Sequence, residues 1–252
     1  MDAYLDRIGA SRPGRPTADG LQNLHAAHLL AVPFENLSIH LGEPIRLDED
    51  GLFDKLVARN RGGFCYELNG AFAALLSGLD FDVTLLAARV FSGDNLGPPF
   101  DHLVLRVDIT EAWLADVGFG QHSLYPLRLD EPAPQADPDG MFVVTHTDQG
   151  DADVAKDDKR QYRIELRPRV LDDFEPVCWW HQASPKSHFT RSLTCSRPTA
   201  TGRVTLSDRR LIRTTDGERH ETELSDDADV LAAYRTYFNI VLDRVPHLTA
   251  MD

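Results

Sequence analysis

The hydrophobic period of this 252-residue sequence changes at about residue 81, and this change limits the kind of fold that the chain can adopt. Before that point, apolar residues recur every three to four positions, which is typical of amphipathic helices. After it, apolar and polar residues alternate in short runs, which is typical of half-buried strands. Short strands and a terminal helix follow in the last part of the chain. The pattern therefore predicts an α+β protein whose helices come first.

Three helices are predicted within the first 80 residues. Thr17 is a suitable N-cap for a helix that ends before Pro33. A second helix is expected to begin at Asp48 and to be stopped by Gly62-Gly63, and a third is expected over residues 65–78. The chain up to about residue 80 should therefore form a helical unit.

The rest of the chain is predicted to be mainly β. Strands are expected over residues 81–90, 102–109, 112–117, 141–145 and 162–166. Residues 148–159 are expected to form a polar, mobile surface loop. Further strands over 203–206, 210–214 and 221–224 precede a helix with an apolar face from Val230 to Val241. The expected division is into three units, residues 1–80, 81–190 and 191–252.

Composition excludes several classes of protein. With 42% hydrophobic and 26% charged residues the chain is of ordinary globular composition, and a net charge of −14 argues against a nucleic-acid partner. Three widely spaced cysteines do not form a disulfide framework. The first residues lack the pattern of a signal peptide, and no apolar run reaches membrane-spanning length. These features lead us to expect a cytoplasmic protein without a membrane partner.

The run Arg61-Gly62-Gly63-Phe64-Cys65-Tyr66-Glu67-Leu68-Asn69-Gly70 marks a candidate nucleophile. Cys65 stands where the third predicted helix begins, and free N–H groups and the helix dipole favour an anion there. An ordinary thiol is only a few per cent ionised at pH 7, and the thiolate is the attacking species. We therefore expect this position, together with a partner imidazolium, to lower the pKa of Cys65.

A histidine and an aspartate follow in two predicted strands. His102 begins the segment His102-Leu103-Val104-Leu105, and Asp116 lies in Asp116-Val117-Gly118-Phe119-Gly120. An aspartate among apolar strand residues is costly to bury unless it has a partner, and an imidazole is a suitable one. Cys65, His102 and Asp116 are therefore interpreted as nucleophile, base and orienting carboxylate.

Taken together, these segments resemble the arylamine N-acetyltransferase family. Two further segments match its pattern in the same order, Val32-Pro33-Phe34-Glu35-Asn36-Leu37 and Ser184-Pro185-Lys186-Ser187-His188-Phe189 continuing to Cys195-Ser196-Arg197-Pro198. The resemblance implies a helical bundle, a β-barrel and a C-terminal α/β lid around a cysteine-protease-like Cys-His-Asp core. The chain is somewhat shorter than the usual member, in its C-terminal half.

The resemblance also implies an activity and its site. The enzyme would be an acyltransferase that moves an acetyl group from acetyl-CoA to an aromatic amine or hydrazine through an acetyl-Cys65 thioester, by a ping-pong route. Phe119 and Phe189 fall where the family lines its acceptor pocket, and Phe34 is expected to reach the same pocket. No tightly bound cofactor and no metal are expected. Xenobiotic metabolism and biosynthesis are both compatible roles.

Four further residues receive supporting roles. Arg61 is expected to brace the turn that carries Cys65, and Glu67 to act as a structural hydrogen-bonding group. Gly118 and Gly120 could let the backbone approach the acyl donor. Basic residues that could meet the phosphates of coenzyme A are Arg191, Arg197, Arg203, Arg209 and Arg210.

Three other functions use the same residues. An amide synthase would apply the Cys-His-Asp set to a carrier-bound polyketide chain. A transglutaminase- or protease-like cysteine hydrolase shares the order of the three residues, and a non-catalytic binding protein could keep the fold. A metal site built from Cys178, His181, His188 and Cys195 matches no standard zinc spacing. Cys178 and Cys195 are expected to be core thiols.

Overall fold

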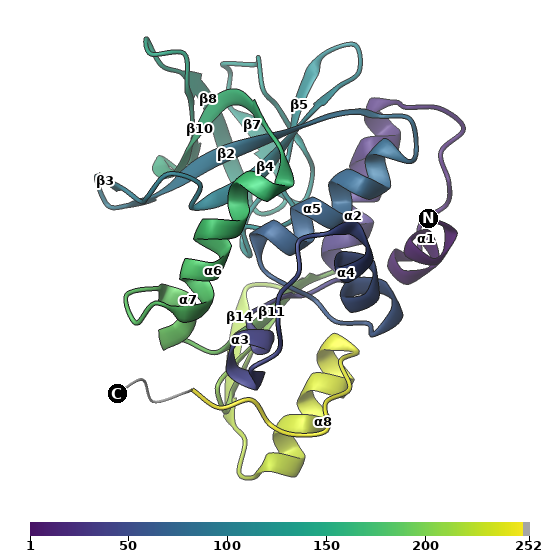
Figure 1. Ribbon diagram of the computed structural model, residues 1–252, viewed down its shortest axis with the longest axis vertical. Coiled ribbons are helices and arrows are strands. Elements are labelled where there is room, and N and C mark those ends of the chain that lie inside the picture. The colour runs from purple at the N-terminus through teal and green to yellow at the C-terminus, as the bar shows by residue number, and fades with distance from the viewer. Residues whose placement is uncertain (249–252) are drawn as a thin grey trace.

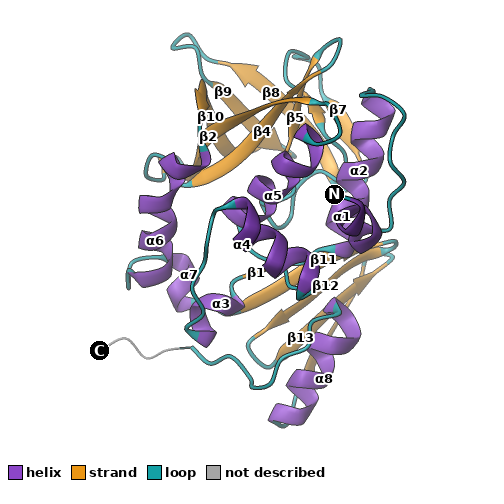
Figure 2. Cartoon of the chain, turned by 45° about the vertical axis from the view of Figure 1, so that its right-hand side comes forward, coloured by secondary structure: helices purple, strands orange, loops and turns teal. Residues whose placement is uncertain are grey.

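Two antiparallel sheets stand on either side of a layer of helices in the computed structural model (Figure 2), which describes residues 1–248. The layer consists of α1 (Asp2–Ile8), α2 (Ala18–Ala31), α3 (Leu37–Leu41), α4 (Glu49–Phe53), the π-helical turn η1 (Asp54–Ala58) and α5 (Cys65–Ser77). The polypeptide passes through the layer first, then builds the larger sheet, and ends in the smaller sheet and α8 (Figure 1).

Side chains cap the helices at the predicted starts. The Thr17 hydroxyl accepts a hydrogen bond from the Gly20 N–H at 3.1 Å, and the Asp48 carboxylate accepts one from the Gly51 N–H at 2.9 Å. Each supplies an acceptor that the first helical turn lacks. The N-caps of α2 and α4 are therefore where the sequence indicated.

The glycine pair has a different role from the predicted helix stop. The helical run already ends at Ala58, and Asn60 reverses the chain with a left-handed φ of 52°. A Cβ on Gly62 would lie 2.0 Å from the Pro33 carbonyl oxygen, and Gly63 forms an isolated parallel bridge with Phe34. Gly62 is therefore required for close packing against the segment after α2, and Gly63 for close packing against the Glu67 side chain, and neither ends a helix.

The larger sheet has nine strands, curls into a nearly closed barrel and forms the upper part of the molecule in Figure 2. Its strand order is β6-β5-β4-β2-β10-β9-β8-β7, with β3 paired to β2. The strands are β2 (Asp82–Ser92), β3 (Asn95–Leu96), β4 (His102–Asp108), β5 (Ala112–Ala115), β6 (Leu127–Arg128), β7 (Gln135–Asp137), β8 (Gly140–His146), β9 (Ala152–Lys156) and β10 (Lys159–Arg169).

Side chains bridge the two edges of this sheet. The Gln135 amide nitrogen donates to the Arg128 carbonyl at 2.9 Å, and its amide oxygen accepts from the Arg128 N–H at 2.7 Å. Asp137 accepts from the N–H groups of Leu124 and Tyr125, both at 3.0 Å. On the β6 edge, the backbone N–H and C=O groups of Arg128 are satisfied in this way.

The smaller sheet forms the lower part of the molecule. Its order is β1-β11-β12-β13-β14, so β1 (Phe34–Glu35) of the helical layer pairs with β11 (Thr194–Thr199) from the last third of the chain. The other strands are β12 (Gly202–Ser207), β13 (Arg210–Thr215) and β14 (Glu218–Glu223). Helix α8 (Asp227–Phe238) packs on this sheet through Val230, Tyr234 and Phe238. The turn η2 (Leu171–Phe174) and helices α6 (Glu175–Ala183) and α7 (His188–Arg191) connect the sheets.

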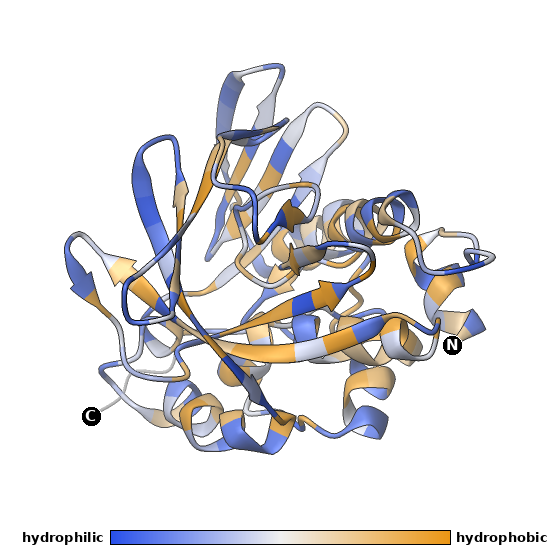
Figure 3. Ribbon diagram, turned by 90° about the horizontal axis from the view of Figure 1, so that it is seen from above, coloured by the Kyte–Doolittle hydropathy of each residue, from blue (hydrophilic) through white to orange (hydrophobic). Residues whose placement is uncertain are grey.

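Three apolar clusters match this layering. One surrounds α5 and extends to the face of β4 that carries Leu103 and Leu105, the second fills the barrel, and the third lies between the smaller sheet and α8. Seen from above, hydrophilic residues concentrate in the outer hairpin loops (Figure 3). The α+β class is confirmed. None of the described helices has the length and apolar composition needed to cross a membrane.

The prediction of a surface loop over residues 148–159 is partly wrong. Within residues 148–159, the segment Ala152–Lys156 is strand β9, paired on both sides with β8 and β10. Ala152 and Val154 are fully buried in the barrel, while Asp153 between them is half-buried and pairs with Arg163 at 2.6 Å. Because the neighbouring residues are charged, the sequence pattern did not indicate the short alternation that places Ala152 and Val154 in the barrel.

Candidate active site

Cys65 is the first residue of α5 and is almost completely buried. The carboxylate of Glu67 accepts a hydrogen bond from the Phe64 N–H at 3.2 Å and thereby caps the helix beside the thiol. The other oxygen of Glu67 accepts from the Lys55 ammonium group at 2.6 Å, and both side chains are buried. Glu67 therefore lies in a buried ion pair that fixes the start of α5.

Arg61 holds the turn before Cys65 against α3. Its guanidinium group donates to Glu35 and to Glu43, each at 2.9 Å, and to the Ser38 hydroxyl at 3.3 Å. Burial on its own would raise the pKa of Glu35, but the charges of Arg61 and Lys55 outweigh it and hold that pKa below its usual range. The structure thus places Arg61 among carboxylates behind the active-site turn.

His102 and Asp116 form a buried pair. His102 begins β4 and Asp116 follows β5, a neighbouring strand, so the sheet brings the two side chains together. The Nε2 atom of His102 lies 2.7 Å from Oδ2 of Asp116. Because Nε2 is engaged by the carboxylate, Nδ1 is the ring nitrogen left for proton transfer with another group.

Asn69 joins this pair to the helix of Cys65. It lies one helical turn after Cys65 on α5, and its amide nitrogen donates to the Leu103 carbonyl at 2.7 Å and to Oδ1 of Asp116 at 2.9 Å. Its amide oxygen accepts from the Val117 N–H at 2.9 Å. One side chain therefore connects α5, β4 and the loop after β5, which carry the three candidate catalytic residues.

Gly118 provides a second direct contact between these elements. A Cβ at this position would lie 2.7 Å from the Cα of Cys65, 2.7 Å from the Asn69 amide nitrogen and 3.0 Å from the Cys65 carbonyl oxygen. Only glycine leaves room for this approach without a shift of the surrounding backbone. The Gly118 N–H also donates to Asp116 at 3.0 Å.

The two acidic groups of the site have opposite pKa shifts. Burial would raise the pKa of Asp116, but the charge and hydrogen bond of His102 outweigh it and keep the carboxyl ionised. Burial raises the pKa of the Cys65 thiol well above its usual value, although the Leu103 N–H opposes the shift. This is contrary to the expected lowering, because the helix terminus is desolvated, and so a thiolate at Cys65 needs an imidazolium as its counterion.

The aromatic residues of the site form two groups. The ring of Phe189 lies 5.1 Å from that of Phe64 and 6.2 Å from that of Phe34, measured between centroids. On the barrel side, Phe119 lies 5.2 Å from His102 and 5.1 Å from Tyr162. The predicted pocket residues are thus divided between the helical side and the barrel side of the site.

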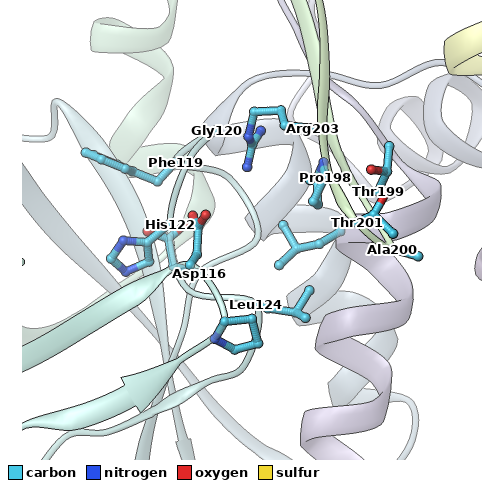
Figure 4. Close-up of a pocket in the computed structure, with 14 residues that line it drawn as sticks. Asp116, Phe119, Gly120, His122, Leu124, Pro198, Thr199, Ala200, Thr201 and Arg203 are labelled. Atoms are coloured by element: carbon cyan, nitrogen blue, oxygen red, sulfur yellow. The ribbon is translucent and has the colours of Figure 1, made fainter. Parts of the chain in front are cut away.

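A cavity of about 330 Å³ lies beside the barrel-side group (Figure 4). Asp116, Phe119 and Gly120 line one end of it, and the hairpin between β11 and β12 lines the other. Gly120 has a left-handed φ of 91° and lies near the ring of Phe34, so its lack of a side chain has a conformational reason. The cavity therefore connects the candidate carboxylate and Phe119, which packs against His102, with the smaller sheet.

Of the five arginines proposed for phosphate contacts, Arg203 lines this cavity. Its guanidinium group donates to the Ser196 hydroxyl at 3.2 Å, and it forms no ion pair within residues 1–248. The others are bound elsewhere: Arg191 and Arg197 to backbone carbonyls, Arg209 to Asp227 and Arg210 to Glu221. Of these five arginines, Arg203 is therefore the candidate whose position in the fold lets it contact a ligand in the cavity.

Two positioning residues were missed from the sequence. Asn69 stood within the ten-residue run around Cys65, and a polar residue on the buried face of an apolar helix was the available signal. His25 of α2 accepts a hydrogen bond from the Asp116 N–H at 3.1 Å through Nε2, and its Nδ1 lies 2.9 Å from the Leu124 carbonyl. Burial lowers the pKa of His25, consistent with a neutral ring. Nothing in the local sequence distinguished it from a core histidine.

The chain is similar to known proteins over nearly its whole length. The profile of the N-acetyltransferase family matches residues 17–246. The arylamine N-acetyltransferase of Mycolicibacterium smegmatis is 35% identical, with 96% of this chain and 92% of the relative covered. The solved structure of the Salmonella typhimurium arylamine N-acetyltransferase superposes with a TM-score of 0.89 at 32% identity, covering 99% of this chain and 94% of that one.

A ligand complex is among the similar structures. The Mycobacterium marinum arylamine N-acetyltransferase, solved in complex with CoA, superposes with a TM-score of 0.86 at 32% identity. The superposition covers 95% of this chain and 92% of that one.

Proposed function

The chain belongs to the arylamine N-acetyltransferase family and is an acyltransferase, and we propose that it acetylates aromatic amines or hydrazines from acetyl-CoA through an acetylated Cys65. The observation that carries the proposal is the joining of α5, β4 and the loop after β5 by Asn69 and Gly118. These contacts hold the backbone of Cys65 against the loop that carries Asp116, the carboxylate that orients His102.

In the first half-reaction, the Cys65 thiol transfers its proton to Nδ1 of His102 as sulfur attacks the acetyl carbon. The carbon–sulfur bond to coenzyme A then breaks, and the departing thiolate takes the proton from the imidazolium. Asp116 stabilises the imidazolium and holds the ring in place. Because the buried thiolate is unfavourable alone, proton transfer within the pair is the route to the nucleophile.

In the second half-reaction, the amine nitrogen attacks the acetyl-Cys65 carbonyl carbon and gives its proton to His102. The carbon–sulfur bond breaks, an amide forms, and the proton passes to the Cys65 sulfur, which restores the resting thiol. Free N–H groups in the first turn of α5 are suitable donors to the oxyanion formed in each step.

The donor and the acceptor are assigned to different parts of the site. Coenzyme A is anionic, and the cavity that begins at Asp116 and Phe119 ends at the cation Arg203. Phe34, Phe64 and Phe189 form an apolar aromatic wall that suits a neutral aromatic amine. We therefore place the donor on the side of the smaller sheet and the acceptor ring against Phe189.

The test is intact-mass measurement after mixing the protein with acetyl-CoA and no acceptor. We expect a gain of about 42 Da, one acetyl group, that is lost when an arylamine is added. Cys65→Ala should show no gain, whereas Cys178→Ala, which removes another buried thiol, should behave as the unaltered protein. A readily alkylated Cys65 that gains no acetyl group would contradict acetyl-CoA as the donor and favour a carrier-bound acyl group, as in an amide synthase.

A further inference from the structure

A second chain of polar side chains lies beside the active site. It consists of Asp101, in the loop before β4, His181 of α6, and Ser187, the N-cap of α7. The Nδ1 atom of His181 lies 3.1 Å from the Ser187 hydroxyl, and its Nε2 atom lies 3.3 Å from Oδ1 of Asp101. His181 is 5% exposed and Ser187 is fully buried, so this chain is inside the protein.

Ser187 links His181 to the backbone of Phe189. The Ser187 oxygen accepts a hydrogen bond from the Phe189 N–H at 3.2 Å, and the same hydroxyl pairs with Nδ1 of His181. The Nε2 atom, on the other side of the ring, faces Asp101 and has no hydrogen-bond partner among the described residues. The backbone of Phe189 is thereby connected through two side chains to a carboxylate.

The ring of His181 also packs against the aromatic residues around Cys65. Its centroid lies 5.1 Å from Phe189, 6.4 Å from Phe64 and 6.0 Å from Tyr66. Phe64 and Tyr66 flank Cys65 in sequence. His181 therefore supports both the proposed acceptor wall and the start of the nucleophile helix.

The other end of the chain is next to the base. Asp101 directly precedes His102, and the Tyr66 hydroxyl donates to the Phe100 carbonyl at 2.7 Å and to the Asp101 carbonyl at 3.2 Å. After burial, the negative charge of Asp101 is among the influences that raise the pKa of Cys65. The carboxylate therefore acts on the nucleophile through space.

We propose that His181 is a positioning residue for the second half-reaction, which holds Phe189 in place for the aromatic acceptor and keeps the Asp101 carboxylate in place beside the base. This inference rests on the proposed function. It is independent of the Cys-His-Asp geometry, because His181 contacts the acceptor wall and the loop before His102, and Asp116 is held by other groups.

The groups that face His181 come from four segments. Asp101 belongs to the loop before β4, Tyr66 to α5, Ser187 to the turn before α7, and His188 to α7 itself. Cys178 lies on the same helix, three residues earlier. Asp101 is the one acidic side chain in this set, so removing its charge isolates the electrostatic effect.

The first experiment separates the two half-reactions. His181→Phe keeps a packed ring and removes both polar contacts, and His220→Phe on exposed β14 makes the same change outside the site. For His181→Phe we expect the KM of the arylamine to rise about three- to tenfold, the effect of one lost hydrogen bond. Acetylation of Cys65 in a single turnover should change less than twofold. Equal slowing of both half-reactions, or an unchanged acceptor KM, would overturn the positioning role.

The second experiment needs no acyl donor and so remains informative if the proposed activity fails. The rate of Cys65 alkylation by iodoacetamide is measured against pH for the unaltered protein and for Asp101→Asn. Removing a negative charge should shift the alkylation profile to lower pH. An unchanged profile would overturn the part of the proposal that concerns Asp101, and this measurement decides it even if His181→Phe does not fold.

Discussion

At the scale of single residues, the candidate site depends on the hydrogen bonds that the Asp116 carboxylate accepts. Asp116 accepts from His102 on one oxygen, and from Asn69 and the Gly118 N–H on the other. All of these groups are buried, so each contact also removes the cost of an unsatisfied polar atom. Asp116 therefore has a structural role in addition to orienting His102.

We predict that Asp116→Asn impairs both stability and activity. An asparagine would place an NH₂ group against at least one existing donor, and breaking a buried charge pair costs about 3–5 kcal/mol. The melting temperature should fall by roughly 10 °C or more, and acetyl transfer should fall by orders of magnitude. Thermal unfolding and steady-state rates measure the two effects, and a normal rate with an unchanged melting temperature would refute the assignment.

The same variant should also change the response to pH. The native pKa of Asp116 is lowered, so its stabilisation is complete above the unfolded-state pKa of about 3.9 and is lost as the pH falls through the lower native value. The free energy of unfolding should therefore decline in acid more steeply for the unaltered protein than for Asp116→Asn. Parallel declines measured by urea unfolding would contradict this.

At the scale of elements, the site depends on a close approach of the loop after β5 to the first turn of α5. Helix α5 packs on β2 and β4 through an apolar face, which fixes its distance from the barrel. Gly118 then allows the loop to contact the backbone of Cys65. The candidate nucleophile and the candidate base are thus positioned by elements that are each held by a core.

We predict that Gly118→Ala separates these elements. The added methyl group would overlap the backbone of a helix that cannot move freely, an overpacking that costs about 1–3 kcal/mol. The rate of Cys65 acetylation should fall more than stability does, because the distance from Cys65 to His102 changes. Gly14→Ala is the matched control, since a Cβ there meets nothing within 4 Å. Acetylation at the unaltered rate in Gly118→Ala would show that the close contact is not required.

At the scale of the whole molecule, the two sheets cooperate to form the cavity. The barrel supplies Asp116, Phe119 and Gly120, and the smaller sheet supplies Arg203. The pairing of β1 with β11 attaches that sheet to the helical layer beside Cys65. The C-terminal part of the chain is therefore part of the site and not an appendage.

We predict that Arg203→Gln weakens the use of acetyl-CoA. Loss of a charged contact with an anionic donor should raise the KM for acetyl-CoA roughly tenfold. The KM for p-nitrophenyl acetate, a donor without phosphates, should stay the same. Arg210→Gln, on the exposed part of β13, is the control. Equal changes with both donors would contradict a phosphate contact and indicate an effect on the fold.

Helices α1, α3, α6 and α7 were not predicted, but the sequence by itself determined the N-caps of α2 and α4, most of the longer strands, and the three candidate catalytic residues. These features depend on local chemistry, namely capping side chains, hydrophobic periodicity and the types of residue that nucleophilic catalysis needs. Strand β9 was missed because its alternating pattern consists of only two buried residues, Ala152 and Val154, within a segment that is otherwise polar and charged. The role of Gly62 was misassigned because its contact is with Pro33, far away in sequence.

Only the tertiary structure decided how the site is held together and what surrounds it. Asn69, His25 and His181 act on groups more than thirty residues away, and one of five similar arginines reaches the cavity. The same holds for the protonation of Cys65. A helix N-terminus favours a thiolate in water, but burial removes the hydration that a charge needs, and burial is a property of the complete fold.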